Sequence, residues 1–276
     1  MGPVLALMAE LAHVYTTLFK MNPYRIGAYL FLDRLMWDLK PQAWSSRSKL
    51  KQLKNTYSGN KAVIICNGPS LLQTDFSLLE NVYTLGLNKI NLLFDQTAFR
   101  PNSIVAVNPY VIEQNKSFFS DTTIPLFLES RASADAGLLD TNAATFLHTI
   151  DFSSFSEDCS ISIFQGYTVT YVAMQLAYHM GFSEVALIGC DHNFQVNGPA
   201  NQLQTARGED LSHFDKNYFS DGQQWQLPDL GQSEVYYALA KEAFEKAGRR
   251  LINATEGGDL EILPRSSLSD FIKPSQ

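Results

Sequence analysis

The stretch Ala62-Val63-Ile64-Ile65-Cys66-Asn67-Gly68-Pro69-Ser70-Leu71 decides the fold. A short apolar run with β-branched residues at its centre predicts a buried strand, and Gly-Pro is a strong signal for a turn. Ser70 then stands where a helix N-cap is expected, ahead of two leucines. A strand that turns into a helix N-terminus presents free N–H groups, which suits a phosphate. The alternative is an ordinary connection between a strand and a helix.

Beyond this stretch, strand and helix patterns alternate along the chain. Helices are predicted most clearly over Thr168–Met180 and Ser233–Ala247. The alternation predicts βαβ units and a mostly parallel sheet, which is a Rossmann-like three-layer α/β fold. We expect this domain over residues 59–276, after an N-terminal helical extension over residues 1–58. The predicted strands are Ala62–Cys66, Val82–Leu87, Ser103–Val107, Ile124–Leu128, Thr145–Thr149, Glu184–Gly189 and Arg250–Asn253.

Several polar residues follow predicted strands and are expected to meet at one edge of the sheet: Asn67 to Ser70, Asn88, Asn108 and Asp191. Sheets of this type bind ligands outside the carboxyl ends of their strands, so we expect a ligand site there. Residues 191–232 show no clear periodicity and are rich in aromatic side chains. A stretch of this length predicts a lid or binding loop. Alternatively, its aromatic residues pack onto the sheet.

Composition excludes several classes of protein. The 276 residues carry a formal net charge of −7, and lysine and arginine are scattered, so no basic face is predicted that would bind nucleic acid. Cys66, Cys159 and Cys190 lack C-x-x-C spacing, which argues against a disulfide framework or a zinc site. We expect buried thiols in a reducing compartment, the cytoplasm.

The amino-terminal region is apolar but interrupted by polar residues. Apolar residues between Leu5 and Leu18 recur at helical spacing and predict an amphipathic helix, and Arg25–Leu39 continues the pattern. The region fits neither a signal peptide nor a membrane-spanning helix. We expect the first helix to pack on its own domain, with peripheral contact to a membrane surface as the alternative.

Several motifs, each at the end of a predicted strand or the start of a predicted helix, together resemble the MptE-like family: Asn67–Leu71, Asn88, Gly166 and Val185–Asp191. The segment Gly248–Glu261 also looks like bacterial members of this group. The family is named for archaeal 6-hydroxymethylpterin diphosphokinases and includes bacterial proteins attached to surface-polysaccharide and flagellin glycosylation. The Asn-Gly-Pro-Ser pattern after a strand is also similar to that of bacterial sialyltransferases that use CMP-sialic acid.

The resemblance implies a nucleotide-binding transferase domain and assigns roles to residues. Asp191 would orient a ribose, hold a metal or cap its loop. The implied partners are a nucleotide or sugar-nucleotide donor and a small-molecule or glycan acceptor. Asn108 is expected to join the nucleotide site because it lies at the same sheet edge. The other residues that would hold the nucleotide are Asn67, Gly68, Pro69, Ser70, Asn88, Gly166 and Thr168.

The chain departs from the sialyltransferase pattern at the residue expected to act as the catalytic base. Those enzymes carry a histidine shortly before the last long helix and a tyrosine just after the Gly-x-Asp turn. Here Leu227–Gln232 contains no histidine, and Asn193 stands at the tyrosine position. His192 and His213 are the candidate replacements, because histidine titrates near neutral pH. Asp215 can orient His213 only within a loop, since residues i and i+2 face opposite ways on a strand.

These features predict a nucleotide-dependent transferase with His213, His192 and Asp191 as candidate catalytic residues. The preferred reaction is glycosyl transfer from a sugar nucleotide in surface-polysaccharide (lipopolysaccharide) or glycoconjugate synthesis. One alternative is transfer of diphosphate from ATP to 6-hydroxymethyl-dihydropterin, which would require Mg²⁺. Another is a nucleotide-binding scaffold without turnover, in which both histidines are structural. No metal site is predicted from the acidic residues of the 191–232 segment, where a solvated loop is the simpler interpretation.

Overall fold

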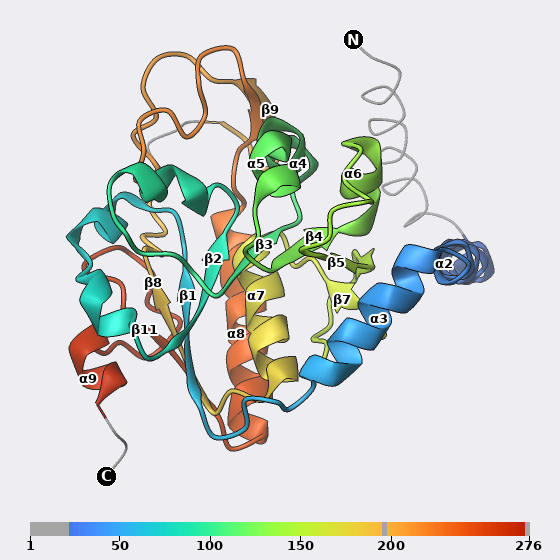
Figure 1. Cartoon of the computed structure of the whole chain (residues 1–276), viewed down its shortest axis with the longest axis horizontal. Coiled ribbons are helices and arrows are strands. Elements are labelled where there is room, and N and C mark those ends of the chain that lie inside the picture. The colour runs from blue at the N-terminus through green and yellow to red at the C-terminus, as the bar shows by residue number, and fades with distance from the viewer. Residues whose placement is uncertain (1–21, 195–197, 274–276) are drawn as a thin grey trace.

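The computed structural model describes residues 22–194 and 198–273 of the chain. Its centre is a parallel sheet of seven strands in the order β11-β8-β1-β2-β3-β4-β5 (Figure 1). The seven strands predicted from the sequence are all present, with small differences at their ends, and the α/β fold class is confirmed. In chain order the strands are β1 (Lys61–Ile65), β2 (Tyr83–Leu87), β3 (Ser103–Ala106), β4 (Leu126–Glu129), β5 (Ala144–Leu147), β8 (Glu184–Ile188) and β11 (Arg250–Asn253).

The order of the strands reverses between β1 and β8. The chain builds outward from β1 to β5 and then places β8 on the other side of β1, with Ile65 paired with Ile188. Every pairing in this sheet is parallel, so the carboxyl ends of the strands meet at one edge. Open α/β sheets bind ligands where the strand order reverses. The residues that follow β1 and β8 flank that point.

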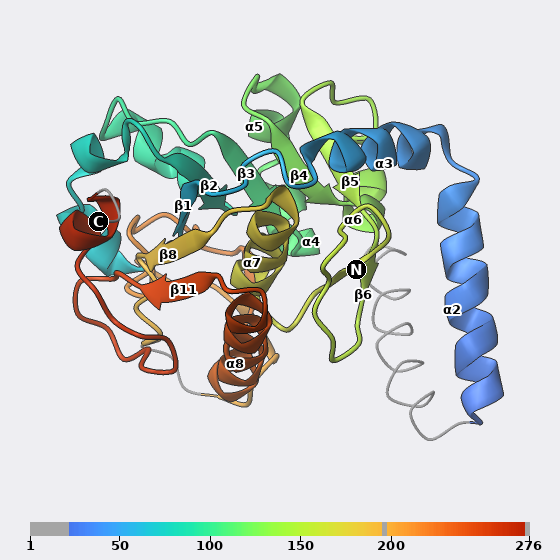
Figure 2. The same cartoon turned by 90° about the horizontal axis from the view of Figure 1, so that it is seen from below.

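Helices cover both faces of the sheet, which gives the molecule three layers (Figure 2). One face is covered by the two long helices α7 (Val169–Met180) and α8 (Leu230–Lys246). The other face is covered by shorter helices and 3-10 turns: η1 (Pro69–Gln73), η2 (Phe76–Leu79), η3 (Ile90–Asp95), α4 (Pro109–Gln114), α5 (Lys116–Asp121), α6 (Ser130–Asp135) and α9 (Leu268–Ile272).

Burial on both faces explains why the strands are apolar almost throughout. Ile64 packs on the side of α7 and α8, whereas Val63 and Ile65 pack on the opposite side. Successive side chains of a strand point to opposite faces of the sheet. A parallel strand covered on both faces therefore needs apolar residues at nearly every position. This is the pattern that made β1 recognisable in the sequence.

Helices α2 (Pro23–Asp38) and α3 (Pro41–Leu53) precede the sheet, and α3 packs against β5. Helix α2 is fastened by Asp33, which contacts His148 and Arg131. Figure 2 shows α2 standing away from the sheet. The helix predicted over Arg25–Leu39 is therefore present, but much of its apolar surface faces outward: Tyr24, Phe31, Leu32, Met36 and Leu39 are exposed.

The helix predicted between Leu5 and Leu18 lies outside the described residues, and its contact with a membrane stays a prediction. None of the helices within residues 22–194 and 198–273 has the length and apolar character that crossing a membrane requires. The boundary predicted between residues 58 and 59 also stays a prediction.

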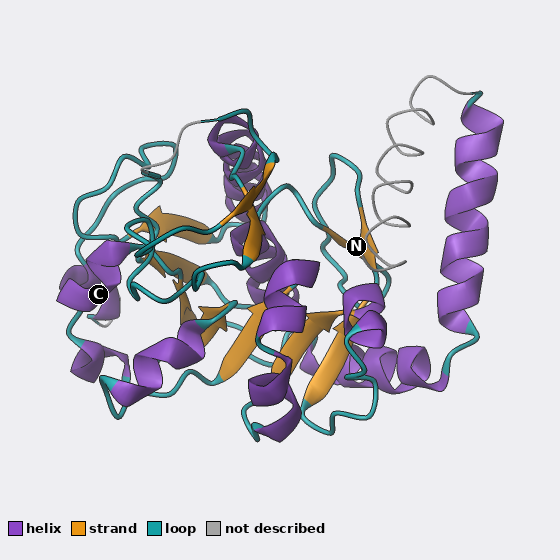
Figure 3. Ribbon diagram, turned by 90° about the horizontal axis from the view of Figure 1, so that it is seen from above, coloured by secondary structure: helices purple, strands orange, loops and turns teal. Residues whose placement is uncertain are grey.

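The described residues of the 191–232 segment lie over the carboxyl edge of the sheet (Figure 1), and Figure 3 views the molecule from that side, opposite to the view of Figure 2. The segment is not structureless, because β9 (Leu203–Thr205) and β10 (Gln224–Gln226) form an antiparallel hairpin within it. A second small sheet pairs β6 (Thr149–Ile150) with β7 (Ile163–Phe164). Phe214 belongs to the buried core, whereas Phe194 lines a cavity. The segment thus packs on the sheet and also covers the edge.

Candidate functional site

Two adjoining cavities open at the carboxyl edge of the sheet. The first has a volume of about 150 Å³ and lies beside the ends of β1 and β8, where the strand order reverses. The second has a volume of about 310 Å³ and lies between the residues that follow β3 and the hairpin β9–β10. The two cavities share part of their walls, including Asn88, Tyr167, Phe194, His213 and Tyr218.

The turn after β1 is organised differently from the sequence prediction. The 3-10 helix η1 begins at Pro69 with Gly68 as its N-cap, so Ser70 lies inside the first turn and is not the cap. The Oγ of Ser70 donates to Oδ2 of Asp191 at 2.8 Å, and the N–H of Ser70 donates to Oδ1 at 3.3 Å. The N–H group expected to hold a phosphate is therefore occupied by a carboxylate of the protein. Pro69 and Ser70 line neither cavity.

Gly68 lets the segments after β1 and β8 come into contact. A Cβ at this position would lie 1.8 Å from Oδ2 of Asp191 and 2.7 Å from the carbonyl oxygen of Gly189. The N–H of Gly68 donates to that carbonyl at 2.8 Å. The hydrogen bond from Ser70 to the carboxylate of Asp191 joins the turn after β1 to the turn after β8. Asp191 nonetheless lines the first cavity.

Asn67 is the residue of this turn with an unsatisfied side chain at the first cavity. It is 8% exposed, and its Oδ1 has no hydrogen-bond partner among the described residues. Its backbone carbonyl accepts a hydrogen bond from the N–H of Phe214 at 2.9 Å. This bond fixes the turn against the described residues of the 191–232 segment, which we call the covering segment. Buried polar atoms in folded proteins usually have partners. The Oδ1 of Asn67 is thus available to a ligand.

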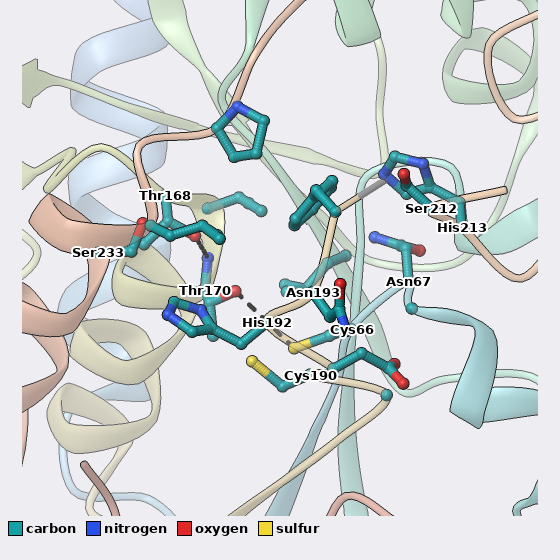
Figure 4. Close-up of a pocket in the computed structure, with 18 of the residues that line it drawn as sticks. Cys66, Asn67, Thr168, Thr170, Cys190, His192, Asn193, Ser212, His213 and Ser233 are labelled. Carbon is teal, nitrogen blue, oxygen red and sulfur yellow. Dashed lines mark hydrogen bonds between the residues drawn. The ribbon is translucent and has the colours of Figure 1, made fainter. Parts of the chain in front are cut away.

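The N-termini of the two long helices meet at the first cavity. Helix α7 begins after Thr168, whose Oγ1 accepts a hydrogen bond from the N–H of Thr170 at 3.3 Å, and both threonines line the cavity. Helix α8 contributes Ser233 from its first turn. Figure 4 shows these three residues on one side of the cavity, opposite Asn67 and His213. Because a helix N-terminus carries partial positive charge, the start of α7 favours an anion. At the start of α8 this charge is partly offset, because the Oδ1 of Asp229 accepts a hydrogen bond from the N–H of Gln232 at 3.0 Å.

Gly166 and Tyr167, directly before α7, both have positive φ, at 58° and 62°. A Cβ at Gly166 would lie 2.3 Å from Cδ1 of Tyr171. The resemblance implied that Gly166 would hold the nucleotide, but its close approach is made to an aromatic ring of the protein. Gly166 lines neither cavity, whereas Tyr167 lines both.

Backbone strain is concentrated around the two cavities. The described residues include five non-glycine residues with positive φ, and all but Asn55 line a cavity. Bulky side chains seldom adopt this conformation. Such residues persist where the surrounding structure holds them, and they cluster at ligand sites. The four residues at the cavities are Asn88, Tyr167, His192 and Asn201.

His213 forms a histidine–carboxylate pair on the wall that both cavities share. Its Nδ1 lies 2.8 Å from Oδ2 of Asp210. Burial alone would raise the pKa of Asp210, but the hydrogen bond and charge of His213 lower that pKa below its ordinary value. An ionised carboxylate at Nδ1 favours the tautomer with its proton on Nδ1, which leaves a lone pair on Nε2. A histidine held in this tautomer has the chemistry required to accept a proton.

Asp215, which the sequence offered as the partner of His213, does not contact it. The Oδ1 of Asp215 accepts a hydrogen bond from the N–H of Asn217 at 2.7 Å. The segment folds back on itself here, and the N–H of Asp210 donates to the carbonyl of Lys216 at 2.8 Å. This turn brings a carboxylate from three positions before His213 into contact with its ring. In the sequence, the only sign of this pairing was that Asp210 lies three positions before His213.

Aromatic rings and a buried lysine hold His213 in place. Its ring stacks on Tyr218 at a centroid distance of 3.9 Å and packs edge-on against Phe219. Lys89, which is 4% exposed, donates to the carbonyl oxygen of Tyr218 at 2.6 Å. Burial lowers the pKa of Lys89 to about 8. Sequence reasoning missed this lysine, although it directly follows Asn88 at the end of β2.

His192 takes part in a second histidine–carboxylate pair. Its Nε2 lies 3.1 Å from Oε1 of Glu234, in the first turn of α8. His192 lines the first cavity only. Glu234 was missed in the sequence because 42 positions separate the two residues. Its side chain is about half exposed, so His192 is held less firmly than His213.

Asn108 lines the second cavity and also begins a helix. Its Oδ1 accepts hydrogen bonds from the N–H of Tyr110 at 2.9 Å and from that of Val111 at 3.3 Å, which caps α4. The residues predicted to hold a nucleotide are therefore divided. Asn67 and Gly68 line the first cavity, Asn108 lines the second, and Asn88 and Thr168 line both.

Two buried thiols form part of the floor of the first cavity (Figure 4). The Sγ of Cys66 lies 3.8 Å from Oγ1 of Thr170. Its hydrogen bond with Cys190, together with burial, raises the pKa of the Cys66 thiol well above its ordinary value. A thiol with a raised pKa stays protonated and is a poor nucleophile. Cys66 therefore acts as a small apolar group.

Comparisons with known proteins place this chain in a family. The family model described as 6-hydroxymethylpterin diphosphokinase MptE-like matches residues 41–197, more than half of the chain. The protein is a member of the MptE-like family. A comparison with curated proteins finds no match.

A solved structure shares the fold. The MAf glycosyltransferase from Magnetospirillum magneticum AMB-1 is similar with a TM-score of 0.50 and 15% sequence identity. The alignment covers 84% of this chain and 39% of that enzyme, so this chain spans about two fifths of its length. At this identity the likeness concerns the fold alone.

Proposed function

We propose that this protein is a glycosyltransferase that moves a sugar from a nucleotide donor to a hydroxyl group of an acceptor. The observation that carries the proposal is the Asp210–His213 pair on the wall shared by the two cavities. A base at this position serves a reaction in which a hydroxyl must lose its proton. The fold of the MAf glycosyltransferase and the family match support a transferase.

The first cavity suits the phosphate of the donor. The N-terminus of α7 supplies partial positive charge, and that of α8 adds less because the carboxylate of Asp229 caps it. The Oδ1 of Asn67 supplies an unused hydrogen-bond acceptor for a sugar hydroxyl. Among the described residues, no lysine or arginine lines this cavity. Helix termini offset about half an elementary charge each. A donor with a single phosphodiester charge therefore fits this site better than one with several phosphate charges.

The transfer step uses the residues in the following way. The Nε2 of His213 takes the proton of the acceptor hydroxyl, while Asp210 stabilises the resulting imidazolium. The acceptor oxygen forms a bond to the anomeric carbon of the donor sugar. The bond from that carbon to the phosphate oxygen breaks, and its electron pair leaves with the nucleotide. The helix N-termini stabilise the charge that the leaving phosphate gains.

The description of the family favours a second candidate, the transfer of diphosphate from ATP to a pterin alcohol. That reaction requires a site for triphosphate charge and for Mg²⁺. Within the described ranges, no group of three or more His, Cys, Asp or Glu side chains is placed to hold a metal. Mg²⁺ at a nucleotide site is held by one or two carboxylates together with substrate phosphates, and Asp191 is the one carboxylate in the described lining of the first cavity. Ser70 also engages the carboxylate of Asp191.

Two measurements test the proposal. Thermal shifts with CMP, UDP, GDP and ATP, with and without Mg²⁺, identify the nucleotide, since a ligand at a hundred times its Kd adds about 2.7 kcal/mol of stability. Release of nucleotide is then followed from CMP-N-acetylneuraminate, UDP-glucose, UDP-N-acetylglucosamine and GDP-mannose. We expect His213→Ala to slow this release by about 10²–10⁴-fold without loss of the thermal shift.

The matched pair Asp210→Asn and Asp215→Asn separates a catalytic role from a structural one. Asp210→Asn removes the ionised partner of His213 and is expected to slow release, whereas Asp215→Asn retains an oxygen for Asn217 and is expected to have no effect. Selective binding of Mg²⁺-ATP would favour the diphosphokinase. Tight nucleotide binding with no release from any donor would support a scaffold and contradict the proposal.

A further inference from the structure

The second cavity has no role in the chemistry described so far, yet it reaches the same base. It has a volume of about 310 Å³ and is lined by His213 on the side that it shares with the first cavity. A donor phosphate at the N-termini of α7 and α8 lies in the first cavity. The second cavity is therefore where a second reactant can approach His213 from the other side.

One part of its wall is aromatic. Tyr110, Tyr167 and Trp225 line the cavity and are half-buried or exposed. The ring of Trp225 stacks on Phe219 at a centroid distance of 5.1 Å and an angle of 22°, so its position is supported from behind. Aromatic rings bind the apolar C–H face of a flat or ring-shaped ligand through a large contact area. Supported rings of this kind hold a ligand without first having to be ordered.

The remaining wall carries polar side chains, and nearly all of them are uncharged. Its described lining includes no lysine or arginine, and the carboxylate of Asp151 is its one acidic group. Burial raises the pKa of the Asp151 carboxyl above its ordinary value. An acidic ligand would meet this carboxylate without a counter-charge. The amides of the wall instead suit hydroxyl groups: Asn108, Gln165, Asn201 and Gln226.

The junction of the two cavities holds buried polar atoms without partners. The Oδ1 of Asn88 and the Oη of Tyr218 form no hydrogen bond of ordinary geometry among the described residues, and both residues line both cavities. The two side chains are nevertheless close enough for Asn88 to lower the pKa of Tyr218 against the larger effect of burial. Burial raises the pKa of Tyr218, so its hydroxyl stays protonated. Leaving such groups unpaired is costly. A ligand hydroxyl at the junction, beside His213, would satisfy them.

We propose that the second cavity binds the acceptor and that the acceptor is a neutral sugar ring. The ring packs its C–H face on the aromatic wall that includes Trp225, and its hydroxyls bind the amides opposite. One hydroxyl reaches the junction, where Asn88 and Tyr218 hold it beside Nε2 of His213. This assignment rests on the proposed glycosyl transfer, because that reaction requires a hydroxyl acceptor at the base.

Saturation-transfer difference NMR tests the acceptor site on the whole chain. The neutral probes are methyl α-glucopyranoside, methyl β-galactopyranoside and methyl N-acetyl-β-glucosaminide, and the comparison probes are glucuronate and 6-hydroxymethylpterin. We expect a signal from at least one neutral probe and at least a tenfold weaker signal from glucuronate. Trp225→Ala is expected to remove that signal. Trp44→Ala, an exposed tryptophan on α3 outside both cavities, is expected to retain it.

A milder variant and a second readout keep the outcomes distinct. Tyr110→Ala removes an aromatic face from the same wall and is expected to weaken the signal if Trp225→Ala does not fold. Thermal shifts with nucleotides are recorded on the same samples. Loss of sugar binding with the nucleotide shift retained assigns the second cavity to the acceptor. Sugar binding that survives both variants, a pterin signal without a sugar signal, or no neutral-sugar signal at all would overturn the assignment, whatever the nucleotide result.

Discussion

Gly68 is the residue on which the contact between the two halves of the sheet depends. A Cβ there would lie 1.8 Å from the Asp191 carboxylate and 2.7 Å from the backbone of Gly189. Backbone atoms cannot move aside as a flexible side chain can, so overpacking here forces the ends of β1 and β8 apart. We expect Gly68→Ala to lower the free energy of unfolding by at least about 2 kcal/mol, measured by urea denaturation.

Gly27→Ala is the control for this substitution. Gly27 lies within α2, and a Cβ there would meet nothing within 4 Å. Alanine is a better helix former than glycine, so this variant is expected to be unchanged or more stable by up to about 1 kcal/mol. Equal stability of the Gly68→Ala variant and the wild type would contradict the close approach.

The same turn shows what a sequence conveys about a single residue and what it does not. The Asn-Gly-Pro-Ser pattern predicted a strand end, a turn and a helix start, and these are present. It also predicted a free N–H for phosphate, because nothing local reveals that Asp191, 121 positions from Ser70, occupies that group. Contacts over such separations are set by the order of the strands, which the sequence pattern does not specify.

At the scale of elements, Lys89 fastens the covering segment to the sheet. Its ammonium group donates to Tyr218 and Gln114 and lies over the ring of Phe219 at 4.8 Å. Burial lowers its pKa to about 8, whereas the ordinary value is 10.5. Between these values the unfolded chain binds more protons than the folded one, so stability rises with pH. We expect a rise on the order of 1 kcal/mol between pH 8 and 10, measured by urea denaturation.

Lys89→Met and Lys216→Met form the matched pair for this effect. Methionine at position 89 cannot titrate, so the rise attributed to the lysine is expected to disappear from the difference between variant and wild type. Lys216 is an exposed lysine of the covering segment and pairs with Glu209. Its replacement is expected to leave the rise of stability with pH intact. An identical pH slope in the wild type and the Lys89→Met variant would exclude Lys89 as its origin.

The elements of the site were predictable to different degrees. The strands and the helices α7 and α8 were predicted because their apolar patterns follow from burial against the sheet. His213 and His192 were selected by their chemistry. Their carboxylate partners, Asp210 and Glu234, could not be assigned, because a turn in an irregular segment brings Asp210 to its histidine and the packing of α8 brings Glu234.

At the scale of the whole molecule, three carboxylates fasten separate parts to the core. Asp33 fastens α2, Asp158 binds Lys54 after α3, and Asp210 orients His213. In each, burial alone would raise the pKa, but hydrogen bonds and neighbouring charges lower it, to about 2 for Asp158. A carboxyl group with a lowered pKa contributes stability that is present above its unfolded value of 3.8 and is lost below it.

We therefore expect the protein to lose stability as the pH falls from about 4 toward 2, with α2 and the covering segment loosening before the sheet. Hydrogen exchange at pH 5, 4 and 3, corrected for intrinsic rates, locates this change. Partly exposed ion pairs contribute about 0.2–1 kcal/mol each, so the loss is gradual. Lys54→Met removes the charge beside Asp158. The loss of unfolding free energy on acidification is expected to be smaller in this variant by the contribution of the Lys54–Asp158 pair. A sheet that opens before α2 would show that the carboxylates do not set the order of unfolding.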